Sequence, residues 1–322
     1  MIKYNKIMMN CVDFKKLTVI VPVYNESDSL NNSMSSLLET LEQVECDCRL
    51  LLVDDGSQDD SWAQIDSFVK LNSCVSAIKL SKNYGKDKAI LAGLEYEDSD
   101  LYLVIDSDGE HPFDRIVDFF STMKEKKWDI VHGIKKGRRG SSFYKFLARS
   151  YNKVFHSFTN VHLLESSDFK LFNRKVRNSV ISYGDIDFFF RAVCQDVGFR
   201  STTIEFSENQ REQGQSSWSL IRLFSFAFNS IVSFSHIPLY LILFLGLISI
   251  LVCTVLSIKL AFQYLIYNNV PEGYTTIILL SSGAIGITMI SLGVVGVYLS
   301  KIFDLTKNRP RYIIESSIGE NE

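Results

Sequence analysis

Two long uncharged stretches near the C-terminus constrain the fold of this chain more than any other feature. Residues 237–258 and residues 273–300 contain no charged side chain. A helix rises about 1.5 Å per residue, so each stretch can cross a hydrocarbon core about 30 Å thick. Buried helices of a soluble protein can also be apolar, but two adjacent stretches of this length favour membrane spans. The sequence therefore predicts a two-helix transmembrane region at residues 236–305.

The charges around these stretches predict their orientation. The short segment between them, roughly residues 267–274, has no Lys or Arg, whereas Lys301, Lys307, Arg309 and Arg311 follow the second stretch. Positive flanks stay in the cytoplasm. The N-terminal residues lack the apolar stretch of a signal peptide. We expect a multi-pass protein of the inner (cytoplasmic) membrane, with both termini and the large N-terminal part in the cytoplasm.

The composition excludes several classes of protein. The 322 residues are 46% hydrophobic and 22% charged, enough for one large or two modest domains. The net charge of −3 and the lack of a long basic tract argue against nucleic acid as a partner. The six cysteines form no CxxC pair, so we expect neither a disulfide framework nor a zinc site.

The N-terminal part alternates predicted strands and helices. This alternation is typical of an α/β fold, in which helices cover both faces of a mostly parallel sheet. Such sheets bind ligands at the carboxyl ends of their strands. Further helices are expected at residues 142–159 and 185–197. The predicted strands are residues 17–24, 49–53, 75–80, 101–105 and 129–133, and the helices between them are residues 27–45, 59–71, 86–96 and 113–127.

Acidic residues follow three of these strands. Asp106 and Asp108 come directly after residues 101–105, and because they are one residue apart they emerge on the same side of the chain. Two carboxylates suit Mg²⁺ or Mn²⁺, which in turn binds a diphosphate. The pairs Asn25-Glu26 and Asp54-Asp55 follow two other strands and are expected at the same edge. This convergence indicates chemistry on a nucleotide-activated substrate.

Five segments, in this order and with the two apolar stretches, resemble family-2 glycosyltransferases with the GT-A fold. The closer resemblance is to the polyprenyl-phosphate branch, which includes bactoprenol glucosyltransferases, dolichyl-phosphate mannose synthases and the aminoarabinose transferase of lipid A modification. It runs from about Leu17 to Tyr312. The segments are Val21–Glu26 (VPVYNE), Val53–Ser57 (VDDGS), Asn83–Lys86 (NYGK), Asp106–Asp108 (DSD) and Lys307–Tyr312 (KNRPRY).

The resemblance implies a nucleotide-sugar site that carries a divalent metal. Asp106 and Asp108 are implied as ligands of Mg²⁺ or Mn²⁺, with Asp108 also catalytic. Glu110 stands where many members carry Gln, and it is either a third ligand or bound to a water. A tight turn at Asp54-Asp55 and a helix cap at Glu26 are alternative roles. The implied nucleotide-sugar-binding residues are Pro22, Tyr24, Glu26, Asp54, Asp55, Lys86 and Asp106.

The acceptor side of the site is also implied by the resemblance. Asp168, in a segment similar to the family's Asp-Phe-Arg-Leu, is expected to be catalytic near the acceptor, either as a base or by orienting it. The alternative is a surface carboxylate paired with Lys170. Arg138, Arg139 and Arg211 are expected to hold the acceptor phosphate, although the first two also suit a solvated loop or lipid head groups.

The predicted function is inverting transfer of one sugar, with glucose on UDP favoured, to undecaprenyl (polyprenyl) phosphate at the cytoplasmic membrane face. The product would serve cell-envelope glycan, O-antigen or lipopolysaccharide modification. N-acetylhexosamine, mannose on GDP and aminoarabinose remain open, and so does a homo-oligomer. A processive polysaccharide synthase, a flippase and a non-catalytic nucleotide-binding membrane scaffold are rival functions.

The predicted domains follow from these assignments. Residues 1–217 are expected to form a cytoplasmic GT-A domain. Residues 218–235, apolar and aromatic with few charges, suit an amphipathic helix in the membrane interface, although a core helix has a similar composition. Residues 236–305 would hold the two spans, and residues 306–322 a cytoplasmic tail.

Overall fold

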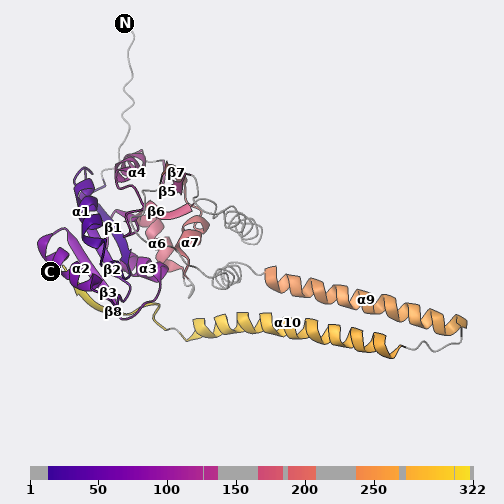
Figure 1. Cartoon of the computed structure of the whole chain (residues 1–322). Coiled ribbons are helices and arrows are strands. Elements are labelled where there is room, and N and C mark those ends of the chain that lie inside the picture. Colours follow the sequence, from indigo (N-terminus) through magenta and orange to yellow (C-terminus); the bar gives the residue numbers. More distant parts are fainter. Residues whose placement is uncertain are drawn as a thin grey trace, which may run out of the picture. The chain divides into compact units, whose positions relative to one another are not determined.

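The computed structural model describes residues 14–125, 127–136, 166–183, 188–207, 237–267, 273–307 and 309–319 (Figure 1). The chain divides into two compact units. One comprises Met1–Ser219 with Pro310–Glu322, and the other comprises Leu220–Arg309. The interfacial helix predicted at residues 218–235 and the helix predicted at residues 142–159 lie outside the described residues.

Within the described residues, the first unit is built on an eight-stranded sheet with the order β7-β5-β6-β4-β1-β2-β3-β8. Its centre is parallel, because β1 pairs in parallel with β2 and β4, and β2 with β3. Strand β6 runs antiparallel to β4 and β5, and β8 antiparallel to β3. The predicted mostly parallel α/β sheet is confirmed. The strands are β1 (Lys16–Val23), β2 (Asp47–Asp54), β3 (Val75–Leu80), β4 (Leu101–Val104), β5 (Ile130–Lys135), β6 (Ser166–Asn173), β7 (Ser201–Phe206) and β8 (Ile314–Ile318).

The central strands are continuously apolar because helices cover the sheet. In α1, Leu30, Met34, Leu37 and Leu41 recur at helical spacing and are all buried, which gives the helix one apolar face. In α3, a Cβ on Gly93 would lie 2.7 Å from the side chain of Ile20 in β1, so glycine permits this close packing. The helices of this unit are α1 (Leu30–Leu41), α2 (Ser61–Leu71), α3 (Lys86–Tyr96), α4 (Arg115–Lys124), α6 (Arg174–Ser182) and α7 (Phe190–Asp196).

The second unit contains two long helices, α9 (Ile237–Tyr267) and α10 (Tyr274–Thr306). Within the described residues, one helical stretch, Gly283–Thr306, is long and apolar enough to cross a membrane by length and composition. The apolar stretch Ile242–Leu256 in α9 is shorter. The pair of spans expected from the sequence therefore remains a prediction.

The residues after α10 join the first unit, which the predicted tail did not anticipate. Strand β8 pairs with β3, and Ser81 N–H donates to the Ile313 carbonyl at 2.9 Å. Arg311 Nη2 lies 2.6 Å from Glu95 Oε1 on α3, and the Tyr312 hydroxyl bonds the same carboxylate. We call residues 311–318 the C-terminal strap. It extends the sheet by one edge strand and binds the last turn of α3 through Glu95.

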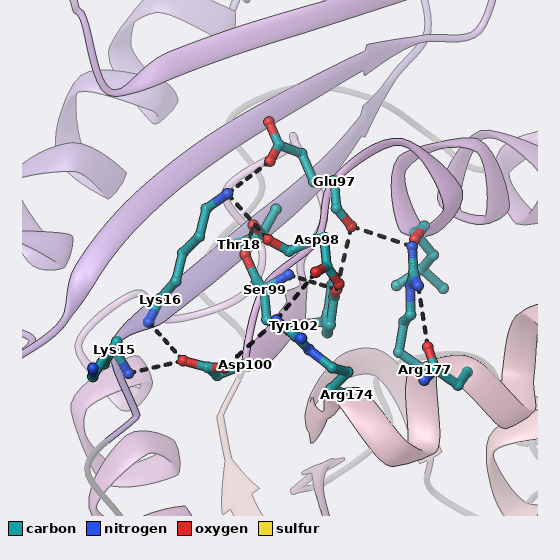
Figure 2. A network of polar contacts seen from close by, with 12 residues as sticks. Lys15, Lys16, Thr18, Glu97, Asp98, Ser99, Asp100, Tyr102, Arg174 and Arg177 are labelled. Atoms are coloured by element: carbon teal, nitrogen blue, oxygen red, sulfur yellow. Dashed lines mark hydrogen bonds and ion pairs between the residues drawn. The ribbon is translucent and has the colours of Figure 1, made fainter. Parts of the chain in front are cut away.

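A polar network at the amino ends of β1 and β4 contacts the C-terminal end of α3 (Figure 2). The Lys16 ammonium lies 3.1 Å from Glu97, and the Asp100 carboxylate accepts the Lys16 backbone N–H at 3.2 Å. From α6, Arg177 Nε donates to the Leu94 carbonyl at 2.7 Å, which satisfies one of the last carbonyls of α3. The C-terminal end of α3 is thus held from two sides, and its other end begins at Lys86.

Candidate active site

The carboxyl ends of β1, β2 and β4 meet at one edge of the sheet and border a hollow of about 240 Å³. A larger hollow of about 790 Å³ lies between α1, α2 and the amino end of β2, away from these strand ends. Seven of the predicted site residues line the smaller hollow, whereas Asp54, Glu110 and Asp168 do not appear in its lining. The lining residues are Pro22, Val23, Tyr24, Glu26, Asp55, Asn83, Gly85, Lys86, Asp106, Ser107 and Asp108.

The turn after β2 positions the loop that leads into α3. Asp54 Oδ2 accepts the Ser57 N–H at 3.1 Å, so this buried carboxylate holds the turn. Both oxygens of Asp55 accept backbone N–H groups, from Tyr84 at 2.7 Å and from Gly85 at 2.8 Å. Burial raises the pKa of Asp55, and these two N–H groups oppose the rise. Asp55 therefore sets the position of the α3 N-terminus beside the hollow.

Glu26 lies just before α1, whose N-cap position is Ser29 and not Glu26. Its carbonyl accepts the Leu30 N–H at 3.1 Å, and its carboxylate accepts the Ser29 hydroxyl at 3.4 Å. The Glu26 N–H donates to the Ser61 hydroxyl at 2.9 Å, which ties this loop to the start of α2. Glu26 also lines the hollow, where the nucleotide-binding role predicts it.

Four charged side chains from four separate segments form an ionic cluster beside the hollow. Lys86 Nζ lies 2.6 Å from Asp106 Oδ1 and 2.6 Å from Asp168 Oδ2. Arg191 on α7 donates to both oxygens of Asp168, from Nε at 2.6 Å and from Nη2 at 2.8 Å. The Asp168 side chain is only 5% exposed. Burial disfavours its charge, but Lys86 and Arg191 outweigh burial and hold the pKa of Asp168 far below its usual range.

The pairing of Asp168 with Lys170, the alternative from the sequence, is not what the structure has. Lys170 is fully buried, and its Nζ lies 3.0 Å from His132 Nδ1. Burial lowers the pKa of Lys170 to about 8 and that of His132 to about 3. Asp168 is a buried member of the ionic cluster instead of a surface carboxylate.

Two residues that the sequence did not single out support this cluster. Arg191 is one. The other is His111, whose Nδ1 accepts the Asp106 N–H at 3.3 Å and whose ring stacks on Phe169 at 5.2 Å between centroids. Burial lowers the pKa of His111, which favours the neutral ring that can accept this bond at Nδ1. The signal available was local: His111-Pro112 follows the acidic segment directly.

The residues implied as metal ligands fit a site that the substrate completes. Among the described residues, no three Asp, Glu, His or Cys side chains gather in a way that could hold a metal by themselves. Asp106 and Asp108 both line the hollow, and Mg²⁺ or Mn²⁺ commonly takes one or two carboxylates together with phosphate and water oxygens. Glu110 Oε2 lies 3.7 Å from Lys135 Nζ, and its N–H donates to Asp108 Oδ1 at 3.0 Å. The donor set thus suits a metal that arrives with a diphosphate.

The predicted acceptor residues Arg138, Arg139 and Arg211 lie outside the described residues. The part of the site that the structure describes therefore comprises the hollow, the ionic cluster and His111.

The chain is similar in sequence to known glycosyltransferases. The family model described as Glycosyl transferase family 2 matches residues 18–198. An uncharacterized glycosyltransferase of Synechocystis sp. is 31% identical over 94% of this chain and 96% of its own length. The putative glycosyltransferase CsbB of Bacillus subtilis is 30% identical, over 94% and 92%. An undecaprenyl-phosphate 4-deoxy-4-formamido-L-arabinose transferase of Proteus mirabilis is 26% identical, over 94% of both chains.

Proposed function

The chain belongs to glycosyltransferase family 2, and we propose that it transfers a single sugar from a nucleoside diphosphate sugar to a polyprenyl phosphate, with inversion at the anomeric carbon. The observation that carries the proposal is the hollow at the strand ends, where Asp106, Asp108 and Lys86 lie together. The Proteus mirabilis relative, named for undecaprenyl phosphate, matches over 94% of both chains and supports the lipid acceptor. We favour UDP-glucose as the donor and undecaprenyl phosphate as the acceptor.

The donor would bind in the hollow. Pro22, Tyr24, Glu26 and Asp55 border the space for the nucleoside. Asp106 and Asp108 would hold Mg²⁺ or Mn²⁺, which when bound neutralises negative charge on the diphosphate. Lys86 offers a further positive charge next to these carboxylates.

The reaction forms one bond and breaks another at the anomeric carbon. An oxygen of the acceptor phosphate attacks that carbon, the bond to the diphosphate oxygen breaks, and the nucleoside diphosphate leaves with the bonding electrons. A phosphate monoester has a second pKa near about 6, so its nucleophilic oxygen is already ionised near neutral pH. Asp168, fixed between Lys86 and Arg191, orients these two cations and does not need to take a proton.

The apolar helices would place the site at the membrane, where the lipid acceptor is found. Removing a polyprenyl chain from the bilayer costs about 0.8 kcal/mol per exposed CH₂ group, so the enzyme has to work at the membrane surface. We propose that α9 and α10 both span the membrane, with both chain ends in the cytoplasm. The interfacial segment 218–235 and the arginines Arg138, Arg139 and Arg211 would bring the lipid phosphate to the site. The products would serve cell-envelope glycan modification.

The test uses the purified full-length protein with undecaprenyl phosphate and a panel of nucleotide sugars, with the lipid product identified by mass spectrometry. We expect one donor, UDP-glucose first, to yield a lipid-linked monosaccharide when Mg²⁺ or Mn²⁺ is present. Asp108→Ala should abolish transfer, whereas the matched change Asp118→Ala on the exposed face of α4 should preserve it. A protein that glycosylates no lipid with any donor would contradict the function. Normal transfer by Asp108→Ala would contradict the metal assignment.

A further inference from the structure

Lys86 forms ion pairs with two carboxylates, Asp106 and Asp168, and these differ in how many other cations neutralise them. Asp168 receives two hydrogen bonds from Arg191 in addition to its contact with Lys86. Among the described residues, Asp106 pairs with Lys86 at 2.6 Å, whereas His111 Nδ1 lies 4.0 Å from its other oxygen and no direct ion pair to Arg191 is present. The ammonium therefore balances Asp106, while Arg191 already balances Asp168.

The position of Lys86 conflicts with a metal on Asp106. The ammonium contacts Asp106 Oδ1, one of the two oxygens through which this carboxylate can bind a cation. A divalent metal on the same carboxylate would place two positive centres within a few ångströms, in a site where Asp106 is only 20% exposed and screening by water is weak. The ammonium and the metal therefore compete for the negative charge of Asp106.

A diphosphate removes this conflict, because it brings new negative charge into the hollow. The Lys86 side chain is 39% exposed and lines the hollow with Asp106 and Asp108, so it can turn from Asp106 toward a phosphate oxygen. We propose that Lys86 is an internal counter-ion that stands in for the divalent metal at Asp106 until the nucleoside diphosphate binds. This inference rests on the metal assignment in the proposed function.

Coupled binding of metal and nucleotide follows from this arrangement. Without nucleotide, a metal on Asp106 has to bind next to the Lys86 ammonium, which Asp168 holds at 2.6 Å, so the affinity for the metal is low. With a diphosphate present, the ammonium moves to the phosphate and the metal binds tightly. Linkage is reciprocal, so the metal raises the affinity for the nucleotide by the same factor.

The test measures Mn²⁺ binding to the full-length protein by electron paramagnetic resonance, without and with UDP. For Lys86→Met, which keeps a straight side chain but removes the charge, we expect Mn²⁺ to bind about tenfold more tightly without UDP. The enhancement by UDP should shrink by a similar factor. Lys86→Arg keeps the charge and should keep free Mn²⁺ binding weak. Lys88→Met removes one charge from the same helix without removing an ion pair to Asp106, and it controls for general electrostatics.

The outcomes separate this inference from the proposed function. Unchanged or weaker Mn²⁺ binding by Lys86→Met without UDP, or an equal gain in Lys88→Met, would overturn the counter-ion. If wild-type protein with UDP binds no Mn²⁺, or binds it equally well after Asp108→Ala, the metal assignment itself fails. Lys86→Gln provides a second neutral variant, and it should shift Mn²⁺ binding in the same direction as Lys86→Met if the inference is correct.

Discussion

Asp168→Asn isolates the role of the ionic cluster, because it keeps the shape of the side chain and removes the one charge that Lys86 and Arg191 share. Removing one partner of a buried ion pair costs about 3–5 kcal/mol. Asp168 is 5% exposed, but both cations are 39% exposed and can regain some water. We therefore expect a loss near the lower limit, about 3 kcal/mol of unfolding free energy.

A loss of this size is measurable as a thermal shift. For a domain of this size it corresponds to a fall in Tm of roughly 6–12 °C. Thermal unfolding of the full-length protein in detergent, followed by circular dichroism, provides the measurement. Asp118→Asn is the matched control, because Asp118 pairs with Arg115 at 2.9 Å with both side chains about half exposed. Such an exposed pair contributes at most about 1 kcal/mol.

The pH dependence distinguishes positioning from proton transfer. The pKa of Asp168 is lower in the folded than in the unfolded protein, so its contribution to stability is complete above the unfolded value and is lost as the pH falls below it. The difference in Tm between variant and wild type should therefore stay constant from about pH 5 to 8. At every pH from about 6 to 9, the kcat of Asp168→Asn should be lower than that of wild type by the same factor. A wild-type kcat that rises with pH, set against a flat profile in Asp168→Asn, would refute this reasoning and make Asp168 the base.

Three further predictions test other parts of the first unit. Burial lowers the pKa of Lys170 to about 8, so the unfolding free energy of wild type should rise as the pH increases above this value. Between pH 7 and 9.5 the rise should be about 2 kcal/mol, and it should be absent in Lys170→Met when thermal unfolding is measured at a series of pH values. Gly56 has φ +67° and a Cβ there would lie 2.4 Å from the backbone of Lys82, so Gly56→Ala should weaken UDP binding in calorimetry. Gly198 has a similar φ of +66°, but a Cβ there would meet only the Asp196 carbonyl at 3.8 Å, so Gly198→Ala should leave UDP binding unchanged. Arg311→Ala breaks the pair with Glu95 and should lower unfolding free energy by about 1–2 kcal/mol in the same thermal assay.

The parallel centre of the sheet was predictable because its strands are buried on both faces and are therefore continuously apolar. Strand β3 matches the predicted range, and β1, β2, β4 and β5 agree within two residues at each end. Strands β6, β7 and β8 were not predicted, and the reasons differ between β6 and β8. β6 carries Asp168 and Lys170 in the interior, where an apolar pattern would be expected. β8 is a short edge strand that is largely exposed, so it has no apolar pattern at all.

The site was predictable to the extent that it follows the strand ends. Asp55, Asp106 and Asp108 meet at the hollow because the carboxyl ends of parallel strands lie at one edge. Arg191 was not predictable in this way, since α7 has no strand-end signal and its contact with Asp168 depends on how α7 packs. The alternative that paired Asp168 with Lys170 was wrong because it also depended on tertiary packing. Lys170 is two residues from Asp168 and so lies on the same face of β6, but tertiary packing places the Lys170 ammonium beside His132.

Helix α3 connects the two features that sequence patterns missed. Its first residues enter the site, where Lys86 contacts Asp168 and Asp87 accepts the Phe190 N–H of α7 at 3.0 Å. Its last turn carries Glu95, which the C-terminal strap grips through Arg311. Arg311 also donates to the Tyr183 carbonyl at 2.8 Å, just after α6. Because α3 carries both sets of contacts, the strap ties the helix that supplies Lys86 to the end of α6, and the chain that follows α10 thereby contributes to the placement of Lys86 in the ionic cluster.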